Sequence, residues 1–433
     1  MNPLIIGVIG ILLVLALMAC KMPIGFAMML VGTVGFAYLV NWQAAFQIVG
    51  VASYGVASNY EWLVLPLFFL LAAILFYGGL GEDMYGIAYV FLGRLPGGLA
   101  MATILANAIF AAISGSSIAG AVTIGTIALP EMKKRTYDDA LRTACVAAGG
   151  TLSILIPPST ILVIYGIITE TSIVQLFAAG FIPGAILSCM FMTMIYVRAR
   201  LNPKLAPPGE RTTMKAKAMG ALKCLDSVVI IVGVMGGLLL GWFTPTEAAG
   251  VACGAAFASS FIRGRLNWKG FKGALLDAVQ NTGMIYACLL GALILTPFIA
   301  VTRIPMELSG LVMSFGLPPV VVMMLIVVVY LILGCFIDTM SIVLLTVPVF
   351  FPLVKGIGYD PIWFGVMVVL VVEMALLTPP VGMNVWVVAG IAKDVPMQTI
   401  FRGIWPFVAI ELVFVVILIF FPQIVMFLPN LLR

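Results

Sequence analysis

The sequence predicts an all-α polytopic membrane protein built from two inverted repeats, each with a re-entrant helical hairpin and a broken helix. Three observations lead to this fold class: a very apolar composition, a long internal repeat and an uneven distribution of positive charge. Of the 433 residues, 63% are hydrophobic and 9% are charged, and the mean hydropathy is +1.22. A soluble domain carries about 25% charged residues, so the soluble globular class is excluded.

The internal repeat relates residues 95–158 to residues 317–380 at a constant separation of 222 residues. Each of the four prolines in the first copy meets a proline in the second. The matched pairs are Leu95 and Leu317, Pro96 and Pro318, Met101 and Met323, Pro130 and Pro352, Lys133 and Lys355, Tyr137 and Tyr359, Asp138 and Asp360, Pro157 and Pro379, and Pro158 and Pro380. Duplicated, proline-broken segments in two halves of a membrane protein are the best sequence indication of a transport site.

Apolar runs long enough to cross a hydrocarbon core of about 30 Å recur along the chain. Residues 3–20 form the first run, which has no basic stretch before it and is followed by Lys21, so we interpret it as a membrane helix and not as a signal peptide. The other expected crossings are residues 23–40, 62–80, 140–168, 173–198, 226–242, 247–262, 274–300, 361–392 and 404–428.

Two further apolar stretches, residues 97–130 and 318–352, are interrupted at their middles by polar and small residues. The interruptions are Ser114-Gly115-Ser116-Ser117 and Ile337-Asp338-Thr339. We expect each stretch to form a re-entrant hairpin with a polar tip. The backbone of such a tip must be buried in protein or line a wet cavity, because its N–H and C=O groups would be unsatisfied in lipid.

Positive charge tests this topology. If the N-terminus lies outside, 19 of the 22 Lys and Arg residues fall on one side, and only Arg303, Lys355 and Arg433 fall on the other. The basic side is the cytoplasmic side. The first hairpin then enters from the cytoplasm and the second from outside, because an odd number of crossings separates the two repeats. The net charge of +5 therefore reflects topology and not a nucleic-acid surface.

Four regions follow from this topology. They are residues 1–58, N-terminal scaffold helices with an interfacial arm; 59–200, the first repeat; 201–273, a cytoplasmic linker with connecting helices; and 274–433, the second repeat. The segment 41–60 is too polar to span easily, and its aromatic residues Trp42, Tyr54 and Tyr60 would anchor it at the interface. The polar stretch 198–223 is either a plain linker or an amphipathic helix on the anionic inner leaflet.

Enzyme chemistry has little support in the sequence. Histidine, the commonest metal ligand and proton shuttle, is absent, and the seven cysteines are scattered through apolar segments without a CxxC pair. No GxxxxGK[ST], HExxH or GxSxG motif occurs. We therefore expect a protein that is not an enzyme, that holds no cofactor and that does not itself hydrolyse ATP.

The polar interruptions are the candidate sites. Half-helix N-termini attract anions, and unwound backbone carbonyls coordinate small cations. The segments that could place such groups at membrane depth are Ser114 to Ser117, Gly149 to Thr160, Asp338 with Thr339, and Glu373 to Asn384. A structural explanation also exists for each, since small residues such as Ser116, Ser117 and Gly150 let membrane helices approach closely and a Pro-Pro pair bends a helix.

Asp338 and Glu373 are the most informative polar residues, because a carboxylate at bilayer depth costs about 2.5 to 3.5 kcal/mol. A sodium ion, a hydrogen-bond network or a proton could offset that cost, or the carboxylates could only link hairpin to helix. Asp138 and Asp360, in contrast, are expected to cap the helices that follow them. The run Thr244 to Glu247 is also expected to be an N-terminal helix cap without further function.

Several strings of residues extend this interpretation from about residue 59 to the end of the chain. They are LPGGLA from Leu95, SGSSIAGAVTIGTIALPEMKKRTYD from Ser114, AAGGTLSILIPPS from Ala147, LFAAGFIPG from Leu176, GWFTPTEAAGVA from Gly241 and LLTPPVGMN from Leu376. In these strings the chain resembles the large membrane subunit of the tripartite ATP-independent periplasmic (TRAP) transporters, in its unfused form. The resemblance implies an elevator-type ion transporter fold, in which the two hairpins and the two broken helices slide against a scaffold.

The resemblance also implies a function. Such subunits import small organic anions with sodium across the bacterial inner membrane, for example C4-dicarboxylates, sialic acid or related sugar acids. They work with a small four-helix membrane subunit and with a periplasmic substrate-binding protein that delivers the anion. The alternative is a stand-alone sodium- or proton-coupled carboxylate carrier of related architecture. An intramembrane enzyme and a scaffold without transport are the interpretations from other classes.

Site residues follow from the resemblance position by position, with sodium as the coupling ion. One sodium site would use Ser114, Gly115, Ser116, Ser117, Gly150 and Thr151. A second would use Asp338 and Thr339 with Glu373, Thr378 and Gly382. The substrate would lie between the tips, near Ser116, Thr160, Asp338 and Asn384.

Overall fold

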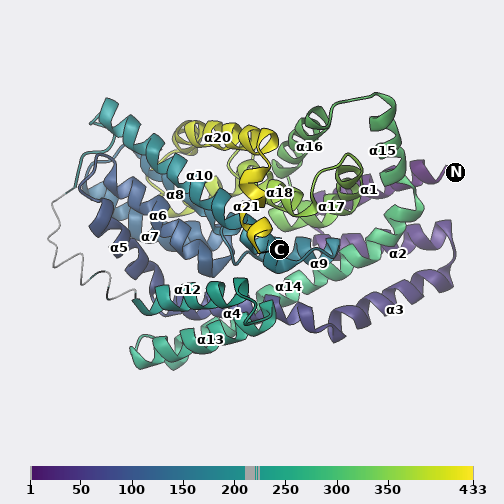
Figure 1. The fold of residues 1–433 in the computed structure, drawn as a ribbon, viewed down its shortest axis with the longest axis horizontal. Helices are drawn as coiled ribbons and strands as arrows, with labels where there is room; N and C mark the ends of the chain where they lie inside the picture. The colour runs from purple at the N-terminus through teal and green to yellow at the C-terminus, as the bar shows by residue number, and fades with distance from the viewer. Residues whose placement is uncertain (1, 210–219, 221, 223–224, 433) are drawn as a thin grey trace.

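The computed structural model describes residues 2–209, 220, 222 and 225–432, and it leaves the side chains of residues 111–114, 226 and 227 undescribed. Every element in this part of the chain is a helix (Figure 1), which confirms the predicted fold class. Part of the polar stretch 198–223, with Arg211, Lys215, Lys217 and Lys223, lies outside the described residues, so both interpretations of it stay open.

The two repeats consist of the same six helices in the same order. In the first they are α5 (Leu80–Leu92), α6 (Gly98–Ser114), α7 (Ser117–Lys134), α8 (Asp139–Leu155), α9 (Thr160–Thr169) and α10 (Ile173–Leu201). In the second they are α15 (Ile304–Ser314), α16 (Pro319–Gly334), α17 (Thr339–Gly356), α18 (Pro361–Ala375), α19 (Met383–Ile391) and α20 (Met397–Phe420). The predicted hairpins are α6–α7 and α16–α17, and the broken helices are α8–α9 and α18–α19.

Side-chain caps start the helices where the sequence predicts them. The Asp138 carboxylate accepts a hydrogen bond from the Leu141 amide at 3.0 Å, and Asp360 accepts one from Ile362 at 2.7 Å. Thr244 and Glu247 form a reciprocal capping box at the start of α13 (Pro245–Ile262), with hydrogen bonds of 3.3 and 2.9 Å. These three cap predictions are confirmed.

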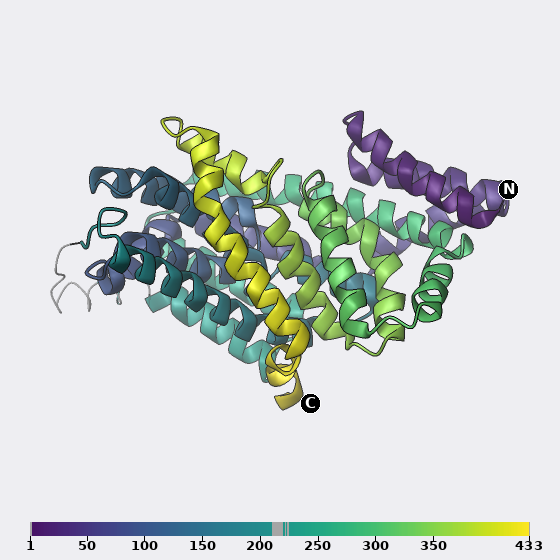
Figure 2. The same ribbon diagram turned by 90° about the horizontal axis from the view of Figure 1, so that it is seen from above.

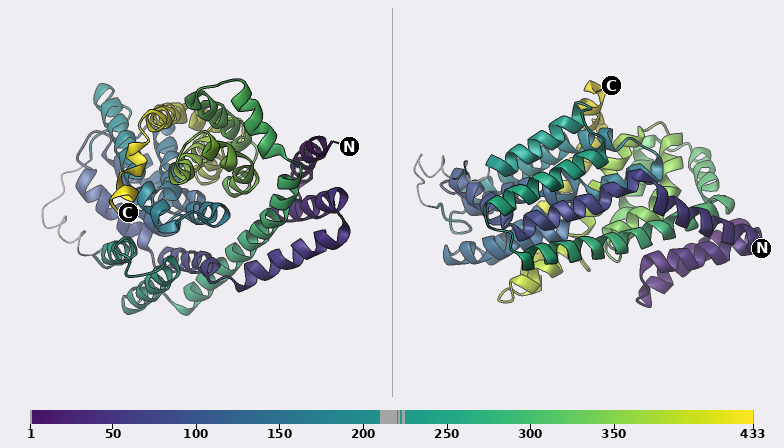
Figure 3. Two further views of the ribbon diagram at one scale, coloured as in Figure 1. Left: turned by 45° about the vertical axis from the view of Figure 1, so that its right-hand side comes forward. Right: turned by 90° about the horizontal axis from the view of Figure 1, so that it is seen from below.

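The remaining helices, apart from the C-terminal α21 (Gln423–Leu431), form a scaffold beside the repeats. They are α1 (Pro3–Ala19), α2 (Ile24–Leu39), α3 (Trp42–Ser58), the short 3-10 helix η1 (Tyr60–Leu63), α4 (Val64–Tyr77), α12 (Leu225–Leu239), α13 and α14 (Trp268–Val301). The long helix α14 packs against α2 and α4, and α13 packs against α4. Figures 2 and 3 show the purple helices α1 and α2 at one end of the molecule, where α2 packs along α14.

Glycines bring α2 and α14 into backbone contact. A Cβ on Gly25 would lie 2.5 Å from the Ala287 carbonyl oxygen, and one on Gly32 would lie 2.9 Å from the Ile294 carbonyl oxygen. Small residues at matched positions allow this close approach of membrane helices.

Replacing Gly32 with Ala is expected to separate these helices, because the added methyl group has no space against the α14 backbone. We expect a loss of about 1 to 3 kcal/mol of stability relative to Gly283→Ala, a substitution in α14 where nothing lies within 4 Å. The midpoint of thermal unfolding of the purified protein measures the difference. Equal midpoints for the two variants would show that the α2–α14 contact is not tight.

The structure departs from the prediction in two expected crossings and in two helices that were not expected. The expected crossing 62–80 ends at Tyr77, and the separate helices α5 and α15 were not predicted. Each follows a residue in the left-handed conformation, Gly79 with φ 72° and Arg303 with φ 60°. The expected crossing 404–428 begins earlier, at Met397, and ends at Phe420 before α21 (Gln423–Leu431). Hydropathy alone does not show these changes of direction inside apolar sequence.

Length and composition mark six segments among the described residues as able to cross a membrane: Tyr60–Tyr77, Asp139–Thr169, Ile173–Leu201, Trp268–Val301, Thr339–Gly356 and Met397–Phe420. The shorter apolar helices α1, α2, α16 and α18 add to this apolar body. In Figure 1 the turn between α13 and α14, which is basic, lies at the left, whereas the N-terminus and α15 lie at the right. This basic turn and the N-terminus therefore lie at opposite ends of the molecule.

Candidate ion and substrate site

The first hairpin tip is bound to the break in the first broken helix. Gly115 lies between α6 and α7 with φ 54°, a conformation that favours glycine. Its carbonyl oxygen accepts a hydrogen bond of 2.9 Å from the Thr160 hydroxyl, at the start of α9. The Ser116 hydroxyl caps α7 by accepting from the Ala119 amide at 3.3 Å. Ser114 ends α6, and its side chain lies outside the described part of the chain.

The second tip has the same relation to the second break. The Cys335 thiol, just after α16, donates to the Pro379 carbonyl oxygen at 3.3 Å and lies 3.8 Å from the Thr378 hydroxyl. Asp338 caps α17, where its carboxylate accepts from the Ser341 amide at 3.1 Å and also from the Ser341 hydroxyl. Gly382 starts α19 with φ 57°. Each repeat thus holds its own tip against its own break.

Asn384 connects the two repeats. Its side-chain amide lies at the start of α19 and donates to the Ser117 hydroxyl at 2.6 Å and to the Ala147 carbonyl oxygen at 3.3 Å. A Cβ on Gly150 would lie 3.3 Å from this amide nitrogen and 2.9 Å from the Ser117 carbonyl oxygen, so glycine is needed there for the three helices to meet. The Asn384 side chain is fully buried, and its carbonyl oxygen has no hydrogen-bond partner among the described residues.

Two buried carboxylates border this junction. The Thr339 hydroxyl lies 3.5 Å from Glu373 on α18, and the Thr151 hydroxyl lies 3.2 Å from Glu411 on α20. Glu373 is 1% exposed and Glu411 is 0% exposed. The helices α18 and α20, which carry these two carboxylates, pack against each other. The two carboxylates therefore lie on neighbouring helices, each beside a threonine from a predicted sodium site.

A second polar group lies beside the first hairpin. The Asn107 amide on α6 donates to the Thr103 carbonyl oxygen at 3.0 Å, but its own carbonyl oxygen has no partner, and the buried Ser153 hydroxyl on α8 has none either. A Cβ on Gly149 would lie 2.6 Å from the Asn107 amide nitrogen. Ser153 lies within the candidate segment Gly149 to Thr160 but was not singled out there, and Asn107 was not predicted, because it lies inside the apolar helix α6 away from the interruption at its end.

The junction has the electrostatics of an ion site without a permanent cation. Four helices begin there, α7 at Ser117, α9 at Thr160, α17 at Thr339 and α19 at Met383, and helix N-termini attract negative charge. The helices α6, α8, α16 and α18 end at the same interruptions, and their free carbonyl groups attract positive charge. The site can therefore accept an anion and cations together.

The predicted residues separate into two sets in the structure. Ser117, Gly150, Thr151, Glu373 and Asn384 meet in the junction, together with Thr339 at the limit of hydrogen-bond distance. Gly115, Ser116, Thr160, Asp338, Thr378 and Gly382 form the tips and breaks around it; Thr378 donates to the Ala375 carbonyl oxygen at 2.9 Å. Glu411 was missed, although a lone carboxylate in an apolar run is itself a signal.

An ion-pair cluster joins the end of α7, the start of α8 and the turn after α19. Asp394, in the turn after α19, lies 2.9 Å from the Lys133 ammonium and 2.7 Å from the Arg142 guanidinium, and Arg142 also pairs with Asp139 at 2.7 Å. The Arg142 side chain is 2% exposed. Lys133 and Arg142 lower the pKa of Asp394 from 3.8 to about 2. The cluster joins the first hairpin and the first broken helix to the second broken helix.

We expect the stability that this cluster provides to be constant between pH 5 and 8. A lowered pKa means that the contribution is complete above the ordinary value of 3.8 and is lost as the pH falls through about 2. Asp394→Asn should lower the unfolding midpoint by the same amount from pH 8 to pH 5, and the difference should shrink below pH 4. The control is Glu131→Gln, which breaks an exposed pair with Lys134. A difference that grows toward low pH would contradict the assignment.

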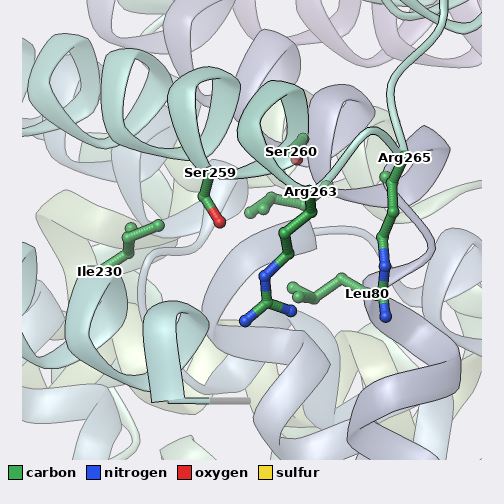
Figure 4. Close-up of a pocket in the computed structure, with 8 residues that line it drawn as sticks. Leu80, Ile230, Ser259, Ser260, Arg263 and Arg265 are labelled. Atoms are coloured by element: carbon green, nitrogen blue, oxygen red, sulfur yellow. The ribbon is translucent and has the colours of Figure 1, made fainter. Parts of the chain in front are cut away.

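A separate hollow lies where α4 turns into α5, against the end of α13. Leu75, Gly78, Leu80, Ile230, Ser259, Ser260, Arg263 and Arg265 line it. Figure 4 shows the Arg263 and Arg265 side chains extending past Leu80. Asp83 on α5 pairs with Arg263 at 3.6 Å and with Arg265. Because none of the residues that line the hollow belongs to the tips or breaks, it marks the joint between scaffold and repeat and not the ion site.

Comparison with known proteins gives consistent matches along the chain. The family model described as "Tripartite ATP-independent periplasmic transporter, DctM component" matches residues 11–424. The C4-dicarboxylate TRAP transporter large permease protein of Pseudomonas aeruginosa is 35% identical over 375 residues, 86% of this chain and 87% of that protein. The sialic acid TRAP transporter large permease protein of Vibrio cholerae is 31% identical over 420 residues, 96% and 97% of the two chains.

Among solved structures, the YdaH transporter of Alcanivorax borkumensis has a similar fold. The TM-score is 0.63, and the match covers 89% of this chain and 90% of that one. Only 14% of the residues are identical, so this likeness concerns the fold alone.

Proposed function

Because this chain belongs to the DctM-component family of tripartite ATP-independent periplasmic transporters, we propose that it imports a small organic anion together with sodium. The protein would lie in a bacterial inner membrane beside a small four-helix membrane subunit. A periplasmic binding protein would deliver the anion. The names of the relatives make C4-dicarboxylates and sialic acid the first candidates for substrate.

The observation that supports this proposal best is the junction between the repeats. The side-chain amide of Asn384, in the second repeat, donates a hydrogen bond of 2.6 Å to the Ser117 hydroxyl at the first tip, beside Gly150 and Thr151. An ion site shared by two inverted repeats, at the ends of broken helices, is the arrangement expected for a secondary transporter. The anion would lie among the helix N-termini near Ser116, Thr160, Asp338 and Asn384.

Sodium would occupy two places in this proposal. The first is formed by residues 114–117 with Gly150 and Thr151, and the second by Asp338 and Thr339 with Glu373, Thr378 and Gly382. Bound sodium would compensate the buried carboxylates and strengthen the attraction for the anion. Loss of sodium on the inner side would then weaken the hold on the anion and release it.

An elevator mechanism would move the hairpins and broken helices as one unit. In support of this, α14, α2 and α4 form a tightly packed scaffold, and the cluster at Asp394 fastens the ends of the opposite unit. The helices α5 and α15, each after a left-handed residue, would act as the connecting arms. Each net positive charge carried inward contributes about 2.3 kcal/mol per 100 mV, so two sodium ions with a monoanion would be driven by voltage.

Uptake into proteoliposomes that contain this chain and its small partner tests the tripartite assignment. Radiolabelled dicarboxylates and sialic acid are supplied with and without the binding protein and with and without a sodium gradient. We expect uptake only when both are present. Uptake that needs sodium or protons but no binding protein would favour the stand-alone carrier. Vesicles with the same sodium concentration on both sides serve as the control.

A further inference from the structure

Glu411 is a fully buried carboxylate in the middle of α20 that the two proposed sodium sites leave out. It lies beside Thr151, and α20 packs against α18, the helix that carries Glu373. None of the ion pairs within residues 2–209 and 225–432 includes Glu373 or Glu411. Two neighbouring buried carboxylates without a basic partner require some other compensation.

The hydrogen bonds that reach these carboxylates are few and long. The Thr151 hydroxyl has one proton, and it also lies 2.7 Å from the Ala148 carbonyl oxygen, a shorter contact than its 3.2 Å to Glu411 Oε1. The contact between the Thr339 hydroxyl and Glu373 Oε1 is 3.5 Å. In the part of the chain that the structure describes, the second oxygens of Glu373 and Glu411, both Oε2, have no hydrogen-bond partner. The protein donors that reach these carboxylates therefore leave the second oxygen of each one uncompensated.

The neighbouring Asn384 provides an independent observation. Its side chain is oriented by the Ser117 hydroxyl and the Ala147 carbonyl oxygen, and its Oδ1 is buried without a partner. The three unpartnered atoms of this junction, on Glu373, Glu411 and Asn384, are all hydrogen-bond acceptors. Acceptors without donors are suited to a hard cation, which prefers carboxylate and carbonyl oxygens.

We propose that Glu411 is the carboxylate ligand of the sodium site that includes Thr151. Two oxygens that lie 3.2 Å apart can both coordinate one cation at the distances of about 2.3 to 2.6 Å usual for a hard ion. Each of the two coupling ions is then held by one buried carboxylate, Glu411 beside Thr151 and Glu373 beside Thr339. This inference rests on the proposed sodium coupling and names the charge that balances each ion.

The sodium dependence of uptake tests this assignment. Glu411→Gln keeps the shape of the side chain but removes its charge, so the sodium concentration for half-maximal uptake should rise by roughly tenfold or more. The steepness of the sodium dependence should also fall toward that of a single ion. The matched control is Glu307→Gln, an exposed carboxylate on α15, which should behave as the unaltered protein does. An unchanged half-saturating concentration in Glu411→Gln would overturn the assignment.

A second measurement uses the unaltered protein and does not depend on how the variant folds. Dicyclohexylcarbodiimide, which modifies protonated carboxyl groups in apolar surroundings, is added to the purified complex in sodium chloride or in choline chloride. Peptide mass spectrometry should show that sodium protects Glu411. Labelling that sodium does not reduce would overturn the assignment, including labelling that depends on pH alone. Failure of the proposed function is distinct, because uptake by the unaltered protein would then show no sodium dependence.

Discussion

Asn384→Leu is expected to lower coupled uptake by about 10- to 100-fold. Leucine has a similar size, but it removes the hydrogen bonds of 2.6 Å to Ser117 and 3.3 Å to the Ala147 carbonyl oxygen. Leaving buried polar groups unpaired costs about 1 to 3 kcal/mol each, and the lost amide also deprives the junction of its Oδ1 acceptor. Initial rates of anion uptake into proteoliposomes measure the effect.

The matched control for this substitution is Asn202→Leu, at the exposed end of α10, which should leave the rate unchanged. Both variants should first be compared by size-exclusion chromatography, so that loss of folded protein is separated from loss of transport. If Asn384→Leu transported at the rate of the unaltered protein, the junction between the repeats would not be the transport site.

Substitutions of Asp338 separate its two possible contributions. Asp338 caps α17 through Ser341, and asparagine caps a helix about as well as aspartate does. If Asp338 binds sodium as proposed, Asp338→Asn and Asp338→Ala should both raise the half-saturating sodium concentration by roughly tenfold or more. If it only caps the helix, Asp338→Ala alone should be impaired, by about 1 kcal/mol of stability.

The sodium dependence of uptake, measured side by side for the two Asp338 variants, decides between these outcomes. Asp338→Asn with the sodium affinity and rate of the unaltered protein would remove Asp338 from the second sodium site. Glu373 would then be the remaining carboxylate there, beside Thr339.

The sequence was most informative where its two halves agree. The 222-residue repeat relates α7, which begins at Ser117, to α17, which begins at Thr339, and both helices run for 18 residues. In the structure, the proline pairs lie in the breaks between α8 and α9 and between α18 and α19. Caps such as Asp138 and Asp360 were predictable because they need only local sequence.

The rest depended on tertiary contacts that no local pattern shows. Glu411 lies in a run of apolar residues, and its proximity to Thr151, 260 residues away, comes only from the packing of α20 on α8. Arg142 was counted as a topology signal, yet it is buried between Asp139 and Asp394. The arms α5 and α15 were missed because a left-handed residue, and not a change in hydropathy, separates them from α4 and α14.

The most direct test of coupled transport is the simultaneous measurement of two fluxes into the same proteoliposomes, radioactive sodium and a labelled candidate anion, in the presence of the binding protein. We predict that sodium enters with the anion in a fixed ratio and that Asn384→Leu reduces both fluxes together, whereas Asn202→Leu reduces neither. Accumulation of the anion without an accompanying sodium flux would contradict sodium coupling at this site.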